Sequence, residues 1–525
     1  MSGSLTAALS RAAHTHGDAL VVLDTPDGLT ETSVAALHTE ARAVAAGLRR
    51  LGVGPGDVVA VQLPNRLETL VAFQAVLLAG ATLLPLVHVY GPREVGFILG
   101  ESGARVLVVP DRWRAIDHAA RVDDLRSACP ELAHVVVVGE APAGTLPWPA
   151  LAIADDGEPG ADAPEVAVLA YTSGTTANPK GVQHTAPGIL AEIETQPTML
   201  GSRSGSVQLV SFPAGHVAGV VSLLRCLVLG TPTIVTDGWD PARALELIST
   251  YGVTYTSGTP LHLVTLLDAL EAGAPIGTLD EYLVGAATVP GALVARADAL
   301  GIHAFRCYGS TEHPTITSGA RDDPLAKRQH TDGRPTPGTE VRVVDEAGLP
   351  VAEGTDGEVV CRGPEQFVGY RDPGLDEDTW LPDRWLRTGD IGNLDAEGYL
   401  TITDRAKDVI IRAGETISSR EVEDVLLSCP GVADAAVVAV PDGRYGERVG
   451  AFVVPGPGGP PDLAAVRAHF AAAGIARQKT PEVLEIRADL PRTPVGKVRK
   501  AELRDELRDE LRRASVTAPG AQSST

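Results

Sequence analysis

The sequence predicts an α/β protein with a large amino-terminal domain of mostly parallel sheets plus a β subdomain, and a small mobile α+β domain at the carboxyl end. Two observations predict the large domain. Valine-rich runs such as ARVLVVP and HVVVVG are typical of strands buried on both faces, and they alternate with helical patterns. A third observation, a series of short strand and helix patterns after residue 404, predicts the small domain.

The alternation begins near residue 57 with DVVAVQL, expected as a strand, and RLETLVAFQAVLLAG, expected as a helix. It continues through TPTIVT, PARALELISTYG, VTYTSGT and PLHLVTLLDAL. After residue 335, TEVRVVD and GEVVCRG follow each other without an intervening helix, which indicates an antiparallel β subdomain. The expected boundaries are residues 1–406 for the large domain, 407–513 for the small domain and 514–525 for a disordered tail.

Composition excludes several classes of function. The chain has 525 residues and a net charge of −23, which disfavours binding to nucleic acid or to an anionic membrane. Residues 217–235 are apolar but interrupted by Arg225, Gly230 and Pro232, so they predict a buried helix and a strand rather than a membrane span. The five cysteines are scattered, and no secretory signal opens the chain, so a cytoplasmic protein is expected.

A phosphate-binding loop is predicted where the strand VAVLAY runs into TSGTTANPKG, residues 172–181. Glycine and small hydroxyl residues let such a loop wrap around phosphate oxygens, and Lys180 adds a positive charge for the outer phosphates. The order of residues differs from that of the Walker A motif. By itself the same composition is also compatible with a surface turn.

YTSGTTANPKG resembles the phosphate-loop signature of the adenylate-forming superfamily, which includes acyl- and aryl-CoA synthetases, adenylation domains of nonribosomal peptide synthetases and firefly-type luciferases. The remaining signatures follow in the family's order and span most of the chain: FPAGHVAG, VGAA, YGSTEH, GEVVCRG, WLRTGD, DRAKDVIIRAGE and PRTPVGKVRK. Ala177 departs from the usual glycine. The stretches GPREVGFIL, YGSTEHPTITSG and ARQKTPE are most similar to those of alicyclic and aryl acid-CoA ligases.

The resemblance implies ATP and Mg²⁺ as cofactors, with coenzyme A or a carrier-protein phosphopantetheine as acyl acceptor. It implies nucleotide contacts at Thr172, Ser173, Gly174, Thr175, Thr176, Lys180, Gly285, Ala286, Ala287, Tyr308, Gly309, Ser310, Thr311, Asp390, Arg405 and Lys497. It implies catalytic roles for Lys497, His216, Glu312 and Thr172.

Three of these roles also have a chemical reason. Glu312 offers a hard carboxylate oxygen suited to Mg²⁺, although a solvated loop glutamate would look the same. Asp390 can accept two hydrogen bonds from one ribose, or it can cap a turn. Lys497 can reduce the repulsion between two anions as charge builds on the α-phosphate, or it can be a solvated lysine near the carboxyl end.

Three further assignments rest mainly on the resemblance. His216 matches an aromatic position that guards the acyl pocket, although a histidine in an apolar loop is often structural. Lys407 matches the hinge residue at which the small domain turns between two half-reactions. Gly414 matches a glycine beside the thiol channel, or it is simply a turn glycine.

The predicted function is activation of a carboxylic acid as an acyl-AMP, followed by transfer to a thiol. Pro213 stands where amino-acid-activating relatives carry an aspartate for the substrate amine, so a hydrophobic, uncharged acid of medium size is expected. The alternatives are loading of a carrier protein and a non-catalytic ATP- or acyl-binding protein. A light-emitting oxygenase shares the fold, but nothing in the sequence singles it out, and a homodimer is left open.

Overall fold

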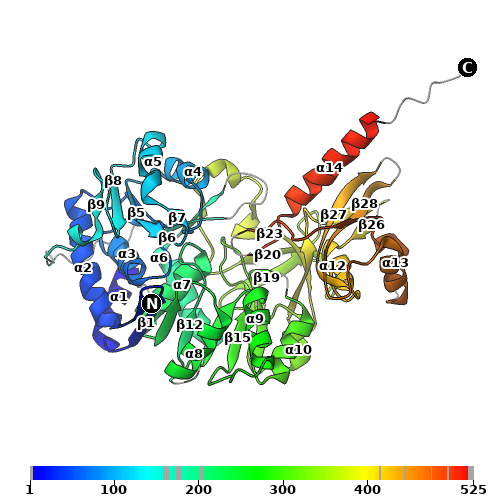
Figure 1. Cartoon of the computed structure of the whole chain (residues 1–525), viewed down its shortest axis with the longest axis horizontal. Coiled ribbons are helices and arrows are strands. Elements are labelled where there is room, and N and C mark those ends of the chain that lie inside the picture. Colours follow the sequence, from blue (N-terminus) through cyan, green and yellow to red (C-terminus); the bar gives the residue numbers. More distant parts are fainter. Residues whose placement is uncertain are drawn as a thin grey trace, which may run out of the picture.

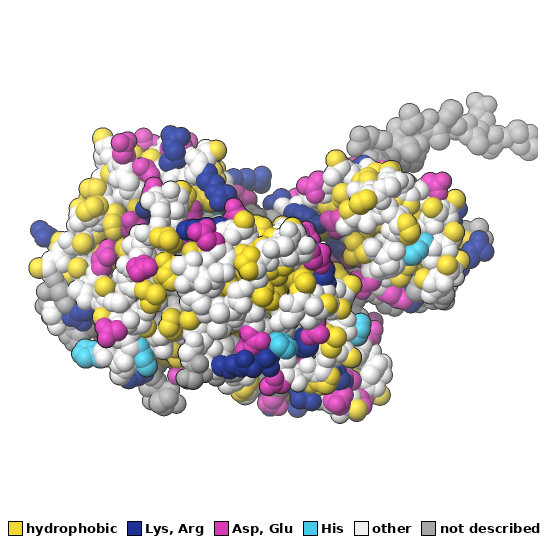
Figure 2. All heavy atoms as spheres, turned by 60° about the horizontal axis from the view of Figure 1, so that its bottom comes forward, with side chains coloured by type: hydrophobic (Ala, Val, Ile, Leu, Met, Phe, Trp, Pro, Cys, Tyr) yellow, Lys and Arg dark blue, Asp and Glu magenta, His cyan; other side chains and the backbone are white. Residues whose placement is uncertain are grey.

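The computed structural model describes residues 4–517 apart from 155–156, 158–164, 173–178, 202, 204, 288, 413–414, 443–444, 474–475 and 494–495. Figure 1 shows a broad amino-terminal body, coloured from blue to yellow-green, and a smaller carboxyl-terminal body, coloured orange and red, from which α14 projects. The acidic side chains are spread over both bodies on the face that Figure 2 draws.

The first large sheet has the order β18-β17-β16-β15-β14-β12-β13-β1-β2, and its centre from β16 to β1 is parallel. Its strands are β1 (Leu20–Thr25), β2 (Gly28–Ser33), β12 (Gln208–Val210), β13 (Thr233–Thr236), β14 (Tyr255–Gly258), β15 (Glu281–Val284), β16 (His303–Tyr308), β17 (Thr317–Ser318) and β18 (Arg334–Pro335). The carboxyl ends of β15 and β16 carry VGAA and YGSTEH.

The second large sheet has the order β21-β11-β10-β4-β3-β5-β8-β9 and is parallel from β10 to β9. Its strands are β3 (Val58–Val61), β4 (Thr82–Pro85), β5 (Val106–Pro110), β8 (His134–Val138), β9 (Leu146–Pro147), β10 (Val168–Tyr171), β11 (Gly181–His184) and β21 (Gly369–Tyr370). A short hairpin, β6 (Arg112–Trp113) and β7 (Ile116–Asp117), follows β5.

Five helices pack between these sheets, because the main apolar core takes side chains from them and from both sheets. They are α1 (Leu5–Thr15), α2 (Val34–Arg50), α3 (Leu67–Leu78), α6 (Ala186–Thr195) and α7 (Val217–Leu229). The outer face of the first sheet is covered by α8 (Pro241–Tyr251), α9 (Pro260–Glu271) and α10 (Gly291–Ala299), and that of the second by α4 (Pro92–Ser102) and α5 (Val122–Ala128). A further helix, α11 (Leu325–His330), packs beside α10.

The β subdomain is a sheet in which β23 pairs with β20, β22 and β24. Its strands are β19 (Glu340–Val344), β20 (Gly357–Arg362), β22 (Trp380–Leu381), β23 (Trp385–Leu394) and β24 (Leu400–Arg405). The antiparallel pairing of β19 with β20 confirms the prediction for TEVRVVD and GEVVCRG.

The small body has its own sheet and its own apolar cores. The sheet contains β25 (Ile410–Arg412), β26 (Glu415–Ile417), β27 (Val432–Asp442), β28 (Gly446–Pro455) and β29 (Val483–Ile486). One face carries α12 (Ser419–Leu427) and α13 (Leu463–Ala472), and the other carries α14 (Lys500–Thr517). The last helix ends at Thr517, so it includes the first four residues of the segment 514–525 that was expected as a tail.

Residues 217–235 form α7 and β13, as predicted. In the part of the chain that the structure describes, no helix has both the length and the apolar character needed to cross a bilayer.

Candidate active site

The base of the predicted phosphate loop is closed by two hydrogen bonds. The backbone N–H of Thr172 donates to the carbonyl oxygen of Lys180 at 3.0 Å, and the N–H of Lys180 donates to Oγ1 of Thr172 at 3.2 Å. Thr172 directly follows β10 and Lys180 directly precedes β11, so the two strands fix both ends of the loop. Ser173, Gly174, Thr175 and Thr176 lie outside the described residues.

Tyr370 connects the phosphate-loop lysine to the predicted metal ligand. Its hydroxyl donates to Oε1 of Glu312 at 2.7 Å, and the ammonium of Lys180 lies 4.9 Å from the centre of its ring. Burial and the Glu312 carboxylate raise the pKa of Tyr370, so the hydroxyl stays protonated at neutral pH. Sequence reasoning missed this residue, and the only available signal was the GY pair at the end of GPEQFVGY.

The backbone around Glu312 is also fixed. The carbonyl oxygen of Glu312 accepts from the N–H of Phe367 at 2.9 Å, and that of Thr311 accepts from Nε2 of His184 at 2.8 Å. Burial lowers the pKa of His184 to about 4, so its imidazole is neutral at pH 7. The Glu312 carboxylate therefore projects from a segment anchored on both sides.

We expect Tyr370→Phe to slow acyl-AMP formation by about tenfold. The change removes the hydrogen bond from Tyr370 to the Glu312 carboxylate and keeps the ring that faces Lys180. A hydrogen bond to a charged group contributes about 1.5–3 kcal/mol. Pyrophosphate release measured as a function of Mg²⁺ concentration checks this, with a raised Mg²⁺ requirement expected. An unchanged Mg²⁺ titration curve would show that Tyr370 does not orient Glu312.

Asp390, on β23, is held by two partners: Arg405 from the neighbouring strand β24, and Tyr308 from the end of β16 in the first large sheet. The hydroxyl of Tyr308 donates to Oδ2 at 2.7 Å, and Nε of Arg405 lies 2.9 Å from Oδ1. The Asp390 side chain is 4% exposed and that of Arg405 is 49% exposed. Each carboxylate oxygen can accept a second hydrogen bond, so the arrangement fits the two hydroxyls of a ribose. The nearby Asp390 charge raises the pKa of Arg405.

The VGAA and YGSTEH loops follow neighbouring strands, and each contains a glycine that is closely packed against other atoms. A Cβ on Gly285 would lie 2.6 Å from Sγ of Cys307, and one on Gly309 would lie 2.0 Å from the carbonyl oxygen of Pro314. Ala286 has a φ of 64°, a left-handed conformation that is rare outside glycine and occurs at ligand-binding loops. Ala287 follows it, half-buried.

The YGSTEH loop folds back on itself, since the N–H of Ser310 donates to the carbonyl oxygen of His313 at 2.9 Å.

Lys497 reaches this group of residues from the small body. Enclosure by protein lowers the pKa of its ammonium, as do the charges of Arg405 and Lys407, whereas Asp390 and Glu312 raise it. The side chain keeps an exposed surface although protein surrounds it. Its loop is closed by the N–H of Thr493, which donates to the carbonyl oxygen of Lys497 at 2.8 Å. The structure thus brings one lysine of the small body among the charged residues of the large one.

His216 is the N-cap residue of α7 and lies within range of the Lys497 charge. Its carbonyl oxygen accepts from the N–H of Val220 at 2.9 Å, and its buried Nε2 has no hydrogen-bond partner within the described residues. Burial, then the charges of Lys497 and His88, lower the pKa of His216 to about 4. No hydrogen bond within the described residues fixes Nε2 in one orientation, and the gate role of His216 stays a prediction.

The predicted hinge lies in a turn between two sheets. β24 ends at Arg405 in the β subdomain, β25 begins at Ile410 in the small body, and residues 406–408 form the turn. The carbonyl oxygen of Lys407 accepts from Nη2 of Arg504 at 3.4 Å. Gly414 lies outside the described residues.

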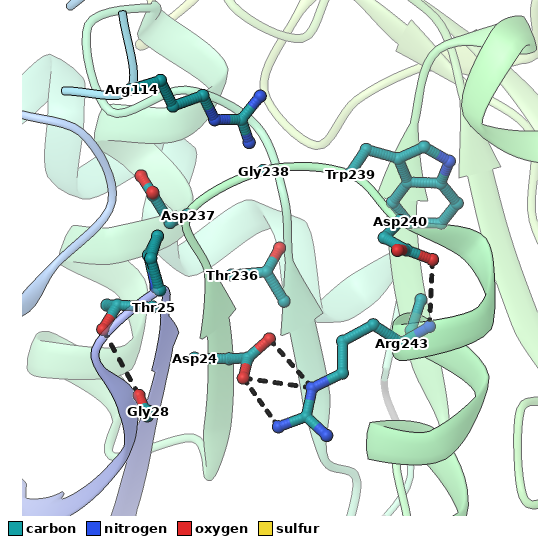
Figure 3. A pocket seen from close by; sticks show the side chains of 12 residues that line it. Asp24, Thr25, Gly28, Arg114, Thr236, Asp237, Gly238, Trp239, Asp240 and Arg243 are labelled. Carbon is teal, nitrogen blue, oxygen red and sulfur yellow. Dashed lines mark hydrogen bonds and ion pairs between the residues drawn. The ribbon is translucent and has the colours of Figure 1, made fainter.

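A separate pocket of about 390 Å³ opens at the ends of β1 and β13, and none of the predicted site residues lines it (Figure 3). Asp24 pairs with Arg243 at 2.7 Å on one side of it, and Arg114 overhangs the Asp237 side. Nε1 of Trp113 donates to the Asp237 carboxylate at 3.0 Å, and the Trp113 ring centre lies 4.3 Å from that of His88. The pocket is therefore distinct from the candidate site.

Comparison with known proteins identifies the family. The AMP-binding enzyme family matches residues 9–371, and the AMP-binding enzyme C-terminal domain matches residues 421–497. The chain is 33% identical to a medium-chain fatty-acid–CoA ligase of Escherichia coli K12, over 91% of this chain and 86% of that protein. It is 37% identical to a 3-[(3aS,4S,7aS)-7a-methyl-1,5-dioxo-octahydro-1H-inden-4-yl]propanoyl:CoA ligase of Mycobacterium tuberculosis, over 88% of this chain and 91% of that protein.

Among solved structures, ATP-bound MatB from Rhodopseudomonas palustris superposes with a TM-score of 0.86 at 26% identity, covering 97% of this chain and 100% of that one. Two domain families matched in order, and relatives matched over nearly their whole length, agree with the α/β fold. The chain belongs to the AMP-binding, adenylate-forming enzyme family.

Proposed function

We propose that this chain activates an uncharged, hydrophobic carboxylic acid as an acyl adenylate at the expense of Mg-ATP and transfers the acyl group to the thiol of coenzyme A. The observation that carries the proposal is that Lys497 lies close enough to Arg405, Asp390 and Glu312 for their charges to shift the pKa of its ammonium. Lysine and arginine charges beside a ribose-compatible carboxylate suit a nucleotide whose α-phosphate is attacked by a second anion.

In the first step a carboxylate oxygen of the acid bonds to the α-phosphorus, and the bond to pyrophosphate breaks. Lys180 lies where it can neutralise the outer phosphates, and Lys497 can neutralise the carboxylate and α-phosphate as they approach. Asp390 orients the ribose. In the second step the acceptor sulfur bonds to the acyl carbon, the thiol proton is lost, and AMP leaves.

Glu312 fits the role of Mg²⁺ ligand. Within the described part of the chain, no group of three or more His, Cys, Asp or Glu is arranged to hold a metal ion by itself. Mg²⁺ commonly binds one or two carboxylates and takes its other ligands from substrate phosphates and water. Held by Glu312, the ion would neutralise and polarise the phosphates. A single carboxylate oriented by Tyr370 matches that donor set.

The domain division supports the two-step proposal. We assign residues 1–406 to an adenylation domain and 407–513 to a mobile domain that turns about Lys407, since the strands on either side of the turn belong to different sheets. This rotation would withdraw Lys497 and bring the loop containing Gly414 to the site.

The five free cysteines favour the cytoplasm as the compartment of this protein.

We expect alicyclic, aryl or medium-chain acids to support ATP-dependent pyrophosphate release, and free α-amino acids and dicarboxylic acids not to. The loop at 212–219 offers Pro213 where an amine would need a carboxylate, and a charged group without a partner costs several kcal/mol to bury. An apolar chain gains about 0.8 kcal/mol per buried CH₂. Initial rates over a panel of acids at saturating Mg-ATP check this. A free amino acid as the best substrate would overturn the assignment of Pro213.

A second candidate function differs from the first only in the acceptor of the acyl group, which would be a carrier protein instead of coenzyme A. A carrier-protein phosphopantetheine presents the same thiol, so coenzyme A and a set of phosphopantetheinylated carrier proteins should be compared as acceptors for the preformed acyl-AMP. A non-catalytic ATP-binding role would give no pyrophosphate release with any acid. Gel filtration would decide between a monomer and a homodimer.

A further inference from the structure

The amino-terminal end of α12 is fastened to β24 by a group of hydrogen bonds that cross the turn at residue 407. The N–H of Ser419 donates to Oδ2 of Asp404 at 2.5 Å, and Oγ of Ser419 donates to Oδ1 at 3.0 Å. Oγ of Ser418 donates to the carbonyl oxygen of Thr403 at 2.8 Å, and Nη1 of Arg420 donates to that of Ile402 at 2.6 Å. We call these contacts between residues 402–404 and 418–420 the interdomain clamp.

The carboxylate of Asp404 is the strongest acceptor in the clamp. Asp404 is 6% exposed and Ser419 is fully buried, so little water competes for these bonds. A carboxylate at the start of a helix also meets the positive end of the helix dipole. Hydrogen bonds to an ionised group are stronger than neutral ones.

The clamp is tied to the segment that carries the active-site lysine. Nζ of Lys500 donates to Oγ of Ser419 at 2.8 Å and pairs with Oε1 of Glu423 at 2.8 Å. Lys500 begins α14, three residues after Lys497 in the chain. Asp404 is thereby linked by hydrogen bonds, through Ser419 and Lys500, to the segment that carries Lys497.

We propose that Asp404 is a positioning residue that holds the small domain in the arrangement used for acyl-AMP formation. The inference rests on the proposed function and on the hinge at Lys407. All four bonds of the clamp join residues on opposite sides of residue 407, so a rotation there breaks them together. Asp404 itself touches no reacting group: it acts by favouring the state in which Lys497 lies beside Asp390.

The test compares the two half-reactions in Asp404→Ala and Ser419→Ala. Asp404→Ala removes both hydrogen bonds from Ser419 and a third, which the N–H of Arg405 donates to Oδ1 at 2.7 Å, whereas Ser419→Ala removes only the Oγ bond to Asp404 and leaves Arg405 untouched. Loss of the clamp's bonds to this charged acceptor should shift the balance between arrangements by about ten- to a hundredfold in Asp404→Ala and by less in Ser419→Ala. We expect ATP–pyrophosphate exchange to fall about tenfold in Asp404→Ala, and thioester formation from supplied acyl-AMP to stay at or above the wild-type rate. Asp404→Asn, which keeps an oxygen acceptor for the Ser419 N–H, should recover part of the exchange rate.

Lys479→Gln is the matched control. It breaks the ion pair between Lys479 and Glu421, whose atoms lie 2.6 Å apart. Glu421 is on α12, like Ser419, but both members of this pair belong to the small domain. Both of its half-reactions should match the wild type.

Equal slowing of both half-reactions in Asp404→Ala and Ser419→Ala, or no change in either, would overturn the inference. A double variant shows whether the pair acts together, because its loss should be smaller than the product of the single losses. Failure of the proposed function gives a different result, since wild-type enzyme would then show no exchange with any acid.

Discussion

Replacement of Lys497 by alanine should slow acyl-AMP formation by about two to three orders of magnitude, the largest effect expected for a single side chain. The charges of Asp390, Glu312 and Arg405 act on the Lys497 ammonium, so it is near enough to the candidate site to offset the repulsion between the incoming carboxylate and the α-phosphate. Loss of one preorganised charge of this kind costs on the order of 3 kcal/mol of transition-state stabilisation. Because the second step does not need this charge, thioester formation from supplied acyl-AMP should survive.

The measurement is pyrophosphate release with the best acid from the panel, next to a single-turnover thioester assay on purified acyl-AMP. Lys479→Ala serves as the control, since that lysine belongs to the same domain but pairs with Glu421. Near-normal pyrophosphate release in Lys497→Ala would remove Lys497 from the mechanism.

Lys407→Pro is expected to separate the half-reactions in the opposite sense. Proline fixes φ near −65° and removes a backbone donor, so the turn at 406–408 would lose the torsional freedom that rotation of the small domain requires. The enzyme should still form acyl-AMP in the arrangement seen here, whereas thioester formation should fall by about a hundredfold or more, as expected when a conformational step is blocked.

Lys407→Ala is the companion variant, because it removes the ammonium and keeps the backbone free. It should perform both steps near the wild-type rate. Equal losses in both half-reactions of Lys407→Pro would indicate misfolding, which thermal denaturation would reveal, and an unimpaired proline variant would move the hinge to another residue.

The fold could be predicted wherever strands are buried on both faces. β5 and β8 are continuous valine runs because α4 and α5 cover one side and the central helices cover the other. The hairpin of β1 and β2 gave no such signal, since every residue of β2 is exposed or half-buried in GLTETS. Its β1 strand joins β13, more than two hundred residues later in the chain, and local pattern cannot show that pairing.

Motif order names the residues of the candidate site but not the contacts among them. Motif order placed Glu312, Asp390 and Lys497, but only the structure shows that Tyr308 and Tyr370 orient the two carboxylates. Both tyrosines reach their partners from other strands, across separations of 82 and 58 residues. Such pairings depend on how the two large sheets and the β subdomain meet, which no spacing within one motif records.

The close approach of Gly285 to Cys307 has a consequence for the fidelity of the reaction. An acyl adenylate is reactive toward any nearby thiolate, and this sulfur lies directly under the VGAA loop. Burial, assisted by the charges of Asp332 and Glu192, raises the pKa of Cys307 to about 12, so at neutral pH it remains a thiol. Because the thiolate is the nucleophilic form, we expect Cys307 to be a poor competitor of the intended acceptor for the acyl group.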